Sequence, residues 1–409
     1  MPGTHRIYLV PGFFGFANLG ELRYFGHVWD FLGRACRAAG LDAEIHTVKT
    51  YPTASLRRRA ARVLETIAAT AHRGDGPIHL IGHSSGGLDV RLLAAPGVSL
   101  ATALDVERFA ARIRTVVTVS APHYGTPVAS FFTSLLGQRL LKVLSLSTIY
   151  VLRFGRVPLS VLLMLGAVFT RLDKRVGIGT ALLDQAFSQL LADFSASRRR
   201  AIASFFGAVE KDQALLPQLT PESMDVFNAA VRDRPGVRYG SVLSQARTPG
   251  VGTTLAAGLD PSAQATHAIY VALHRLAAQT TPAQMPPLTR EQVRAARHFY
   301  GKQPDAAAND GVVPTRSQAW GQIIHAARAD HLDVVGHFAD AAHVPPHVDW
   351  LTTGSGFNRP RFEALWTAVA GYLAGASSTR PRARRAPGTA PRAGDPGLPR
   401  WRRERRSAG

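Results

Sequence analysis

Short aliphatic runs alternate with longer stretches of helical spacing along this chain, and this alternation limits the fold more than any other feature. Runs of β-branched and aliphatic residues between turn residues predict buried strands, and apolar residues at every third or fourth position predict helices. Such an alternation favours an α/β fold with a mostly parallel sheet flanked by helices. The predicted strands are residues 6–10, 43–48, 78–82, 113–120 and 237–244, and the predicted helices are residues 22–39, 54–72, 87–95 and 361–373.

The sequence GHSSGG stands between the third predicted strand and a helix, with Ser84 at its centre. GxSxG in a strand, turn, helix context is typical of a nucleophile elbow, in which a strained turn presents the serine at the carboxyl end of the sheet. Gly82 and Gly86 leave room for that turn. The following helix points its amino-terminal N–H groups at the same place, which favours negative charge there. The pattern predicts Ser84 as a nucleophile.

Acyl transfer at a serine builds an oxyanion, which requires preorganised hydrogen-bond donors. The N–H of Ser85, directly after the nucleophile, is one candidate. The segment VPGFFGF after the first strand offers a second, and its position favours the N–H of Phe13. The alternative is that Gly12 and Gly15 only serve a tight strand-to-helix turn.

A serine nucleophile also needs a base and an acid that orients it, and in the elbow-bearing folds the chain order is serine, acid, histidine. Asp310 lies in a predicted turn, Asn309-Asp310-Gly311, and His331 follows it. From the residues alone other histidines and aspartates stay open as base and acid. These competitors are His337, His343, His347, Asp305 and Asp333.

Residues 128–204 break the alternation, because they are rich in leucine, carry scattered arginines and are interrupted at Gly155 and Pro158. The pattern predicts several helices inserted into the sheet domain. They are either core helices or a mobile cap whose apolar face covers the active site and turns toward lipid. The expected organisation is one domain over residues 1–375, with this helical lid or cap, and a disordered basic tail over residues 376–409.

Several separated motifs together resemble the bacterial true lipases, the triacylglycerol lipases of the Pseudomonas and Burkholderia type. The matching segments are VPG with Phe13, GHSSGG, SAPHYGTPVASFF, LTPESMDVFNAAV with GVRYGSV, NDGVVP and HLD, in the same order. The resemblance implies an α/β-hydrolase fold with an interfacial lid inside the insertion after Pro127. It further implies Ser84 as nucleophile, Asp310 as acid, His331 as base, and Phe13 and Ser85 as oxyanion donors.

Two features depart from those lipases. Their usual His-Gly before the oxyanion residue is Pro11-Gly12 here. In those lipases the aspartate of HLD, here Asp333, ligates a structural calcium with a second aspartate upstream of the acid, and neither Asp260 nor Asp305 is a convincing counterpart. We therefore expect no required cofactor and leave a structural calcium at Asp333 as an alternative to a local hydrogen bond.

The formal charge of +20 is disproportionately placed in the tail, where ten arginines face two acidic residues. The tail is either solvated or binds an anionic lipid, nucleic acid or acidic partner. No sequence-specific nucleic-acid motif is present, so nucleic-acid binding would rest on charge alone. The single cysteine, Cys36, excludes an internal disulfide. No signal peptide or membrane-spanning run is recognised, which predicts a cytoplasmic protein, although secretion by another route stays open.

The function expected is hydrolysis of esters of acyl chains or lipids through an acyl-enzyme, with transient membrane contact through the lid and the basic tail. An acyltransferase, a thioesterase or an amidase would use the same catalytic residues. A catalytically idle module that docks on anionic membranes is the alternative from another class.

Overall fold

The computed structural model describes residues 4–13, 24–71, 76–154, 156–169, 179–340, 342, 349 and 351–378. Six strands form one sheet: β1 (His5–Val10), β2 (Ala43–Thr47), β3 (Ile78–His83), β4 (Ile113–Val119), β5 (Arg238–Ser244) and β6 (Gln322–Ala327). Their order is β2-β1-β3-β4-β5-β6, and every neighbouring pair is parallel. The mostly parallel sheet is therefore confirmed, and β6 is a strand that the sequence did not predict.

The register of the central strands brings their carboxyl ends together. Val10 pairs with Gly82, His83 pairs with Val119, and Val119 pairs with Val242. Because the strands are parallel, the loops that follow β1, β3, β4 and β5 all leave from one edge of the sheet. Sites in α/β sheets form at this edge.

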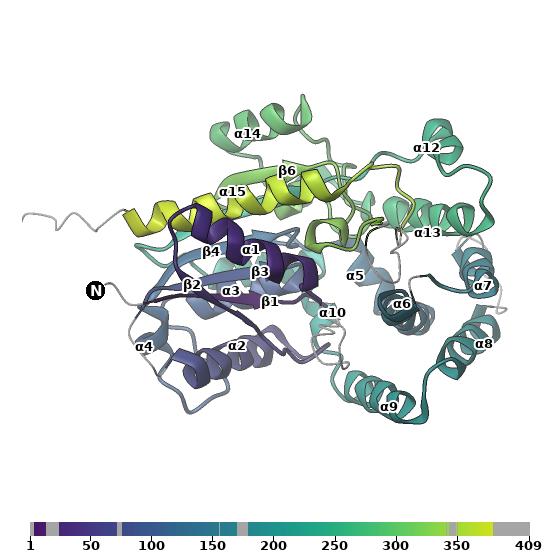
Figure 1. Cartoon of the computed structure of the whole chain (residues 1–409), viewed down its shortest axis with the longest axis horizontal. Coiled ribbons are helices and arrows are strands. Elements are labelled where there is room, and N and C mark those ends of the chain that lie inside the picture. The colour runs from purple at the N-terminus through teal and green to yellow at the C-terminus, as the bar shows by residue number, and fades with distance from the viewer. Residues whose placement is uncertain are drawn as a thin grey trace, which may run out of the picture.

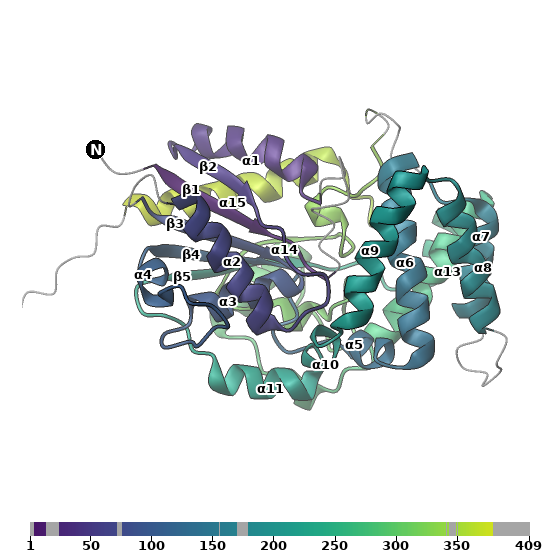
Figure 2. The same cartoon turned by 90° about the horizontal axis from the view of Figure 1, so that it is seen from below.

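Helices cover both faces of the sheet, as predicted (Figures 1 and 2). On one face, α1 (Gly26–Ala38) packs on α15 (Arg359–Ser378), and on the other, α2 (Leu56–Thr70) packs on α3 (Ser85–Ala94). Ser55 caps α2 by accepting a hydrogen bond from the N–H of Arg58, and the buried side chains of the helix recur at helical spacing. The predicted helix at residues 361–373 is longer than expected at both ends.

The span that breaks the alternation is helical and lies to one side of the sheet (Figure 2). It contains α5 (Pro127–Phe132), α6 (Leu135–Phe154), α7 (Leu159–Phe169), α8 (Gly179–Ala192) and α9 (Ala196–Lys211). We call α6 to α9 the insertion helices. The last of them runs seven residues past residue 204, the expected end of the insertion. Within the described residues, none of the helices combines the length and the hydropathy that crossing a membrane requires.

The remaining helices frame this core. They are α4 (Val106–Ala110), α10 (Leu215–Gln218), α11 (Pro221–Ala230), α12 (Val251–Ala256), α13 (Pro261–Ala277) and α14 (Arg290–Tyr300). The unpredicted α13 packs against α7, and α14 packs against β6 in a small apolar cluster that includes Ala296, Tyr300 and Ile323. The disordered tail was predicted over residues 376–409, but residues 376–378 are helical and end α15, and residues 379–409 lie outside the described residues.

Candidate active site

Ser84 occupies the tight turn between β3 and α3. Its backbone has φ 53° and ψ −131°, a conformation that costs energy for a residue with a side chain. The turn is held by a 2.9 Å hydrogen bond from the N–H of Ser84 to the carbonyl of Val119. This strand, strained turn and helix, set in a parallel sheet with helices on both faces, is the α/β-hydrolase fold.

The two glycines of GxSxG are required by close backbone approach. A Cβ atom on Gly82 would lie 2.2 Å from the carbonyl oxygen of Gly86, and one on Gly86 would lie 2.3 Å from the carbonyl oxygen of Val10. Neither distance is compatible with any side chain, and in both cases the obstacle is backbone that cannot turn aside. The elbow therefore depends on glycine at both positions, as the sequence predicted.

Asp310 and His331 meet at the same edge of the sheet. Nδ1 of His331 lies 2.8 Å from Oδ2 of Asp310, and the backbone N–H of His331 donates to the carbonyl of Asp310 over 3.1 Å. Since a carboxylate only accepts, Nδ1 carries the proton and Nε2 is left as an acceptor. Of the competing histidines, His337 donates from Nε2 to the carbonyl of Tyr24. His343 and His347 lie outside the described residues.

Asp310 is fully buried and accepts hydrogen bonds on both carboxylate oxygens. Oδ1 accepts from the N–H groups of Val312 and Val313, while Oδ2 accepts from Ser244, Gln318 and His331. These five hydrogen bonds satisfy the buried carboxylate. Sequence reasoning missed Ser244 and Gln318, since a serine at a strand end and a glutamine in the single turn Thr315–Gln318 carry no signal of their own.

His331 is also placed next to the elbow. The ring of His83, the residue before Ser84, lies 4.8 Å from the ring of His331 between centroids, and Nε2 of His83 donates to the carbonyl of His331 over 2.9 Å. No hydrogen bond joins Ser84 Oγ to His331 among the residues that the structure describes. Such contacts are often loose before substrate binds.

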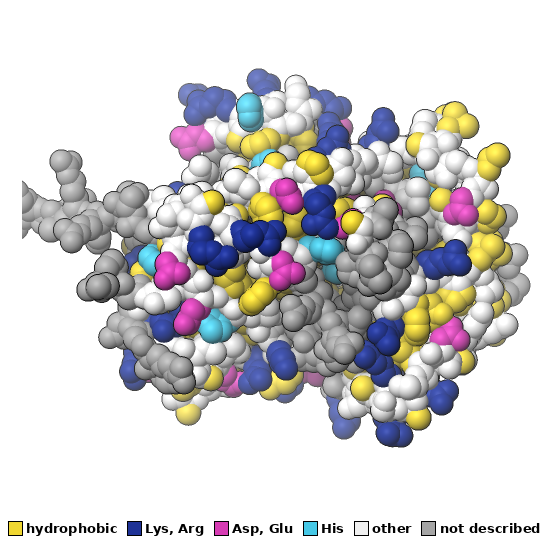
Figure 3. All heavy atoms as spheres, viewed as in Figure 1, with side chains coloured by type: hydrophobic (Ala, Val, Ile, Leu, Met, Phe, Trp, Pro, Cys, Tyr) yellow, Lys and Arg dark blue, Asp and Glu magenta, His cyan; other side chains and the backbone are white. Residues whose placement is uncertain are grey.

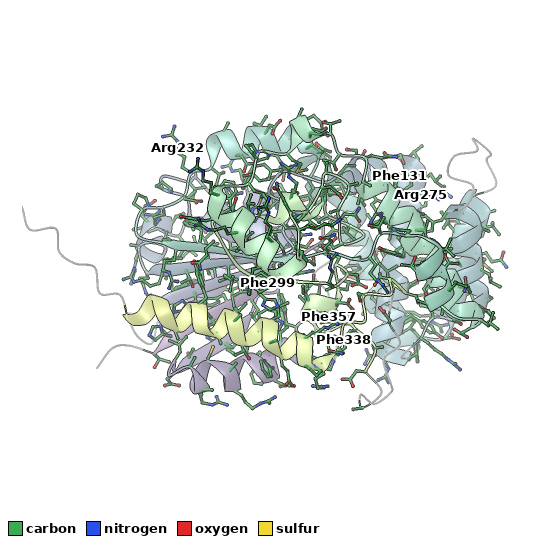
Figure 4. The ribbon with its side chains drawn as sticks, turned by 90° about the horizontal axis from the view of Figure 1, so that it is seen from above. Phe131, Arg232, Arg275, Phe299, Phe338 and Phe357 are labelled. Carbon is green, nitrogen blue, oxygen red and sulfur yellow. The ribbon has the colours of Figure 1, made fainter. Side chains whose placement is uncertain are left out.

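The loop that carries His331 is anchored on α15. The indole N–H of Trp366 donates to the carbonyl of Val334, and Phe338 packs on Phe357 with ring centroids 5.5 Å apart. Figure 4 shows Phe338 and Phe357 together where the loop meets α15. All three side chains are buried, so the histidine is held on a packed loop.

The loop after β1 approaches the serine closely enough to supply an oxyanion donor. A Cβ atom on Gly12 would lie 2.6 Å from Cβ of Ser84, so Gly12 touches the elbow and Phe13 follows directly. The first N–H groups of a helix have no partner within it, which leaves the N–H of Ser85 at the start of α3 as the other donor. Of the two predicted oxyanion residues, Phe13 thus follows the glycine that touches Ser84, and Ser85 follows Ser84 itself.

Arg59 on α2 holds this loop from beneath. Its guanidinium donates to the carbonyls of Pro11 at 2.8 Å and Gly12 at 3.3 Å, and it forms a buried 2.7 Å ion pair with Asp89 of α3. Because the C=O and N–H of a trans peptide point in opposite directions, fixing the carbonyl of Gly12 also fixes the N–H of Phe13. Arg59 therefore provides support that does not depend on the missing histidine before Gly12.

A group of three acidic side chains lies just beyond His331. Asp330, Asp333 and Asp349 bring one carboxylate oxygen each within 4.8 Å of one another. Burial raises the pKa of all three carboxyls, and neighbouring carboxylates raise those of Asp330 and Asp349 further. Within the described part of the chain, Oδ1 of Asp333 and Oδ1 of Asp349 are buried without a hydrogen-bond partner. Unused carboxylate oxygens of this kind suit Ca²⁺.

The two aspartates upstream of the acid do not belong to this group. Asp260 accepts from the N–H of Ala263 at the start of α13, and Asp305 accepts from the N–H groups of Ala307 and Ala308. Each carboxylate is thus used by local backbone. The partners of Asp333 are Asp330 and Asp349, which sequence reasoning did not identify.

A cavity of about 420 Å³ lies among the insertion helices and reaches the loop after β1. Figure 3 shows apolar side chains gathered in the hollow between α6, α8 and α9, with basic side chains beside them. The apolar part of the lining includes Phe13, Leu141, Leu183, Phe187, Phe206 and Leu216. Phe13 links this lining to the elbow, because it directly follows Gly12, which touches Ser84.

No protein-family profile and no curated protein matches this chain. Similar solved structures include a metagenomic carboxyl esterase, at 20% identity and a TM-score of 0.45 over 90% of this chain and 75% of that one. EstA from Clostridium botulinum is 16% identical with a TM-score of 0.48, over 91% and 88% of the two chains. Lipase 1 from Pelosinus fermentans is 18% identical with a TM-score of 0.47, over 91% and 98%. These likenesses are too distant to assign an activity.

Proposed function

We propose that this chain is a serine hydrolase that cleaves carboxylic esters of acyl chains or lipids. The observation that carries the proposal is the buried Asp310–His331 pair beside the strained elbow of Ser84. A serine hydroxyl is a weak nucleophile without a base, and a histidine oriented through Nδ1 is the usual way to activate it. The resemblance to the bacterial true lipases assigns the same three roles.

The reaction proceeds in two acyl transfers. Ser84 Oγ attacks the ester carbonyl while Nε2 of His331 takes its proton, and the N–H groups of Phe13 and Ser85 stabilise the oxyanion. His331 then gives the proton to the departing alcohol as the C–O bond breaks. Water, deprotonated by the same nitrogen, attacks the acyl-serine, and His331 returns the proton to Ser84. Asp310 stabilises the imidazolium at both stages.

The cavity among the insertion helices supports an acyl chain as the group recognised, since its lining is largely apolar and includes Phe13, which follows the glycine that touches Ser84. Burial of apolar chain contributes about 0.8 kcal/mol per methylene. In this proposal the insertion helices act as a lid that faces lipid, and the protein makes transient contact with membranes through the lid and the basic tail. Cytoplasmic placement belongs to the same proposal.

Covalent labelling tests the chemistry directly. A fluorophosphonate probe is expected to modify Ser84, identified by peptide mass spectrometry, and p-nitrophenyl esters of increasing acyl length are expected to show rising kcat/KM until the cavity is filled. An unlabelled protein that nevertheless binds anionic vesicles would instead support the idle membrane-docking module. Release of free acid distinguishes a hydrolase from an acyltransferase that transfers to an added alcohol, and an acyl thioester substrate tests the thioesterase alternative.

Calcium is proposed as a structural ion held by Asp330, Asp333 and Asp349, where it would neutralise the buried carboxylates beside the base loop. We expect added Ca²⁺ to raise the free energy of unfolding, by about 2.7 kcal/mol at a concentration one hundred times Kd. Thermal unfolding with Ca²⁺ and with a chelator measures the difference. Asp333→Asn should remove the response, whereas Asp260→Asn, which keeps its helix cap, should retain it. A wild-type melting temperature indifferent to Ca²⁺ and chelator would contradict the site.

A further inference from the structure

Three buried hydrogen bonds form a line between the loop after β1 and the loop of His331. The N–H of Gly12 donates to Oη of Tyr24 over 3.3 Å, Oη lies 2.5 Å from Nδ1 of His83, and Nε2 of His83 lies 2.9 Å from the carbonyl oxygen of His331. Tyr24 is 5% exposed and His83 is fully buried. The line thus runs through the core beneath Ser84, from one part of the proposed catalytic site to another.

The donor and the acceptor of each hydrogen bond in this line can be assigned in only one way. The carbonyl of His331 can only accept, so Nε2 of His83 carries the proton and Nδ1 is an acceptor. Tyr24 must then donate its hydroxyl proton to Nδ1, and Oη is free to accept from the N–H of Gly12. Burial lowers the pKa of His83 well below its usual value, which agrees with a neutral ring. Because each donor and acceptor is set, the three hydrogen bonds hold the N–H of Gly12 and the carbonyl of His331 in a fixed relative position.

Gly12 and His331, at the two ends of the line, are each next to or part of a group that the proposed reaction uses. Gly12 precedes Phe13, the proposed oxyanion donor, and touches Ser84. Both backbone polar groups of His331 are hydrogen-bonded, because its N–H donates to the carbonyl of Asp310 and its carbonyl accepts from His83. The base loop also holds Tyr24, since Nε2 of His337 donates to the carbonyl of Tyr24.

We infer that Tyr24 and His83 are positioning residues that tie the oxyanion loop to the base loop, so that both are aligned on Ser84 together. Neither side chain touches the reacting atoms in this inference, which rests on the proposed function. Misplacement by about 1 Å is enough to cost up to about 100-fold in rate. Loss of the line should therefore lower kcat while leaving the acyl cavity, and hence KM, intact.

The test is a double-mutant cycle with Tyr24→Phe and His83→Leu. We expect each variant to lower kcat for a p-nitrophenyl ester by about 10- to 100-fold with KM within about twofold. Because both act through one line, the double variant should resemble the more damaged single variant instead of showing the product of the two effects.

Two matched controls lie in the neighbouring strands. Tyr8 of β1 is buried and its hydroxyl contacts Thr70 at 2.8 Å, while His79 of β3 is buried and contacts Thr115 at 2.8 Å. Tyr8→Phe and His79→Leu remove similar groups and should lower the melting temperature with kcat within about twofold of wild type. If Tyr24→Phe behaves like Tyr8→Phe, or if the two effects multiply, the inference is overturned.

Hydrogen exchange gives a readout that does not require turnover. The N–H of Gly12 donates to Tyr24, so loss of the Tyr24–His83 hydrogen bond in His83→Leu should speed amide exchange at Gly12 and Phe13. We expect that increase, together with faster exchange around residue 331, and neither change in His79→Leu. Unchanged exchange at Gly12 and Phe13 would overturn the link even if the protein proves not to be an esterase. Absence of turnover in wild type, with the exchange link intact, would count against the proposed function alone.

Discussion

Ser84→Ala is expected to lower kcat for a short p-nitrophenyl ester by about 10⁴-fold or more while the protein stays folded. Only the hydroxyl group is lost, but without it the base has no proton to accept and no acyl-enzyme can form. Ser84 is 8% exposed at the elbow, so the smaller side chain leaves the packing of the turn almost unchanged. Steady-state kinetics, with circular dichroism and a melting curve on the same sample, provide the measurement.

Ser147 offers a matched control for that substitution. It is buried in α6, and its Oγ has no hydrogen-bond partner in the described residues. Ser147→Ala removes the same atom from a buried serine and should leave turnover within about twofold of wild type. Turnover by Ser84→Ala at the rate of Ser147→Ala would refute Ser84 as the nucleophile.

The sheet could be predicted from sequence as far as β5 because its central strands β1, β3 and β4 are almost wholly buried and rich in aliphatic residues, whereas the edge strand β2 is only partly buried. A parallel strand covered on both faces leaves this pattern wherever it lies. Strand β6, with sequence QIIHAA, begins with exposed Gln322 and carries a histidine at position 325, so its pattern is weak. It becomes a strand because it pairs with β5 and packs against the helices α14 and α15. Such tertiary context leaves no signal in the local sequence.

The candidate active site likewise has residues that could be predicted from the sequence and residues that could not. Ser84 could be predicted because the elbow is a local structure with its own glycines. The pairing of Asp310 with His331 depends on two loops that meet in space, so the residues alone left several histidines open and only the resemblance selected one.

Support groups were hardest to foresee. Arg59 stands in the run Arg57-Arg58-Arg59, and only the packing of α2 on α3 buries the third of these arginines against Asp89 while the first two stay exposed. His83 occupies a position of GxSxG at which any residue type fits the motif. Its role arises from a tyrosine and a carbonyl that other segments bring to it. Groups that act through distant backbone atoms are visible only once the chain is folded.

Asp310→Asn is expected to lower kcat by about 10⁴-fold with little change in KM. Oδ1 of the carboxylate serves the N–H groups of Val312 and Val313, so an asparagine oxygen would keep those bonds and its NH₂ group would take the place of Oδ2. A donor would then face Nδ1 of His331, which must become the acceptor. The imidazole proton would move to Nε2, where it prevents that nitrogen from accepting the proton of Ser84.

The same substitution should also cost stability, because the NH₂ group would meet the donors of Ser244 and Gln318 as well. A buried polar group left unsatisfied costs about 1–3 kcal/mol. Asp305→Asn is the control, since an exposed aspartate that accepts from two backbone N–H groups is replaced by a side chain that accepts equally well. Kinetics and denaturant unfolding on both variants separate the two effects. If Asp310→Asn lost stability yet kept kcat within tenfold of wild type, Asp310 would be a structural residue of the loop and the base would have to be oriented by another group.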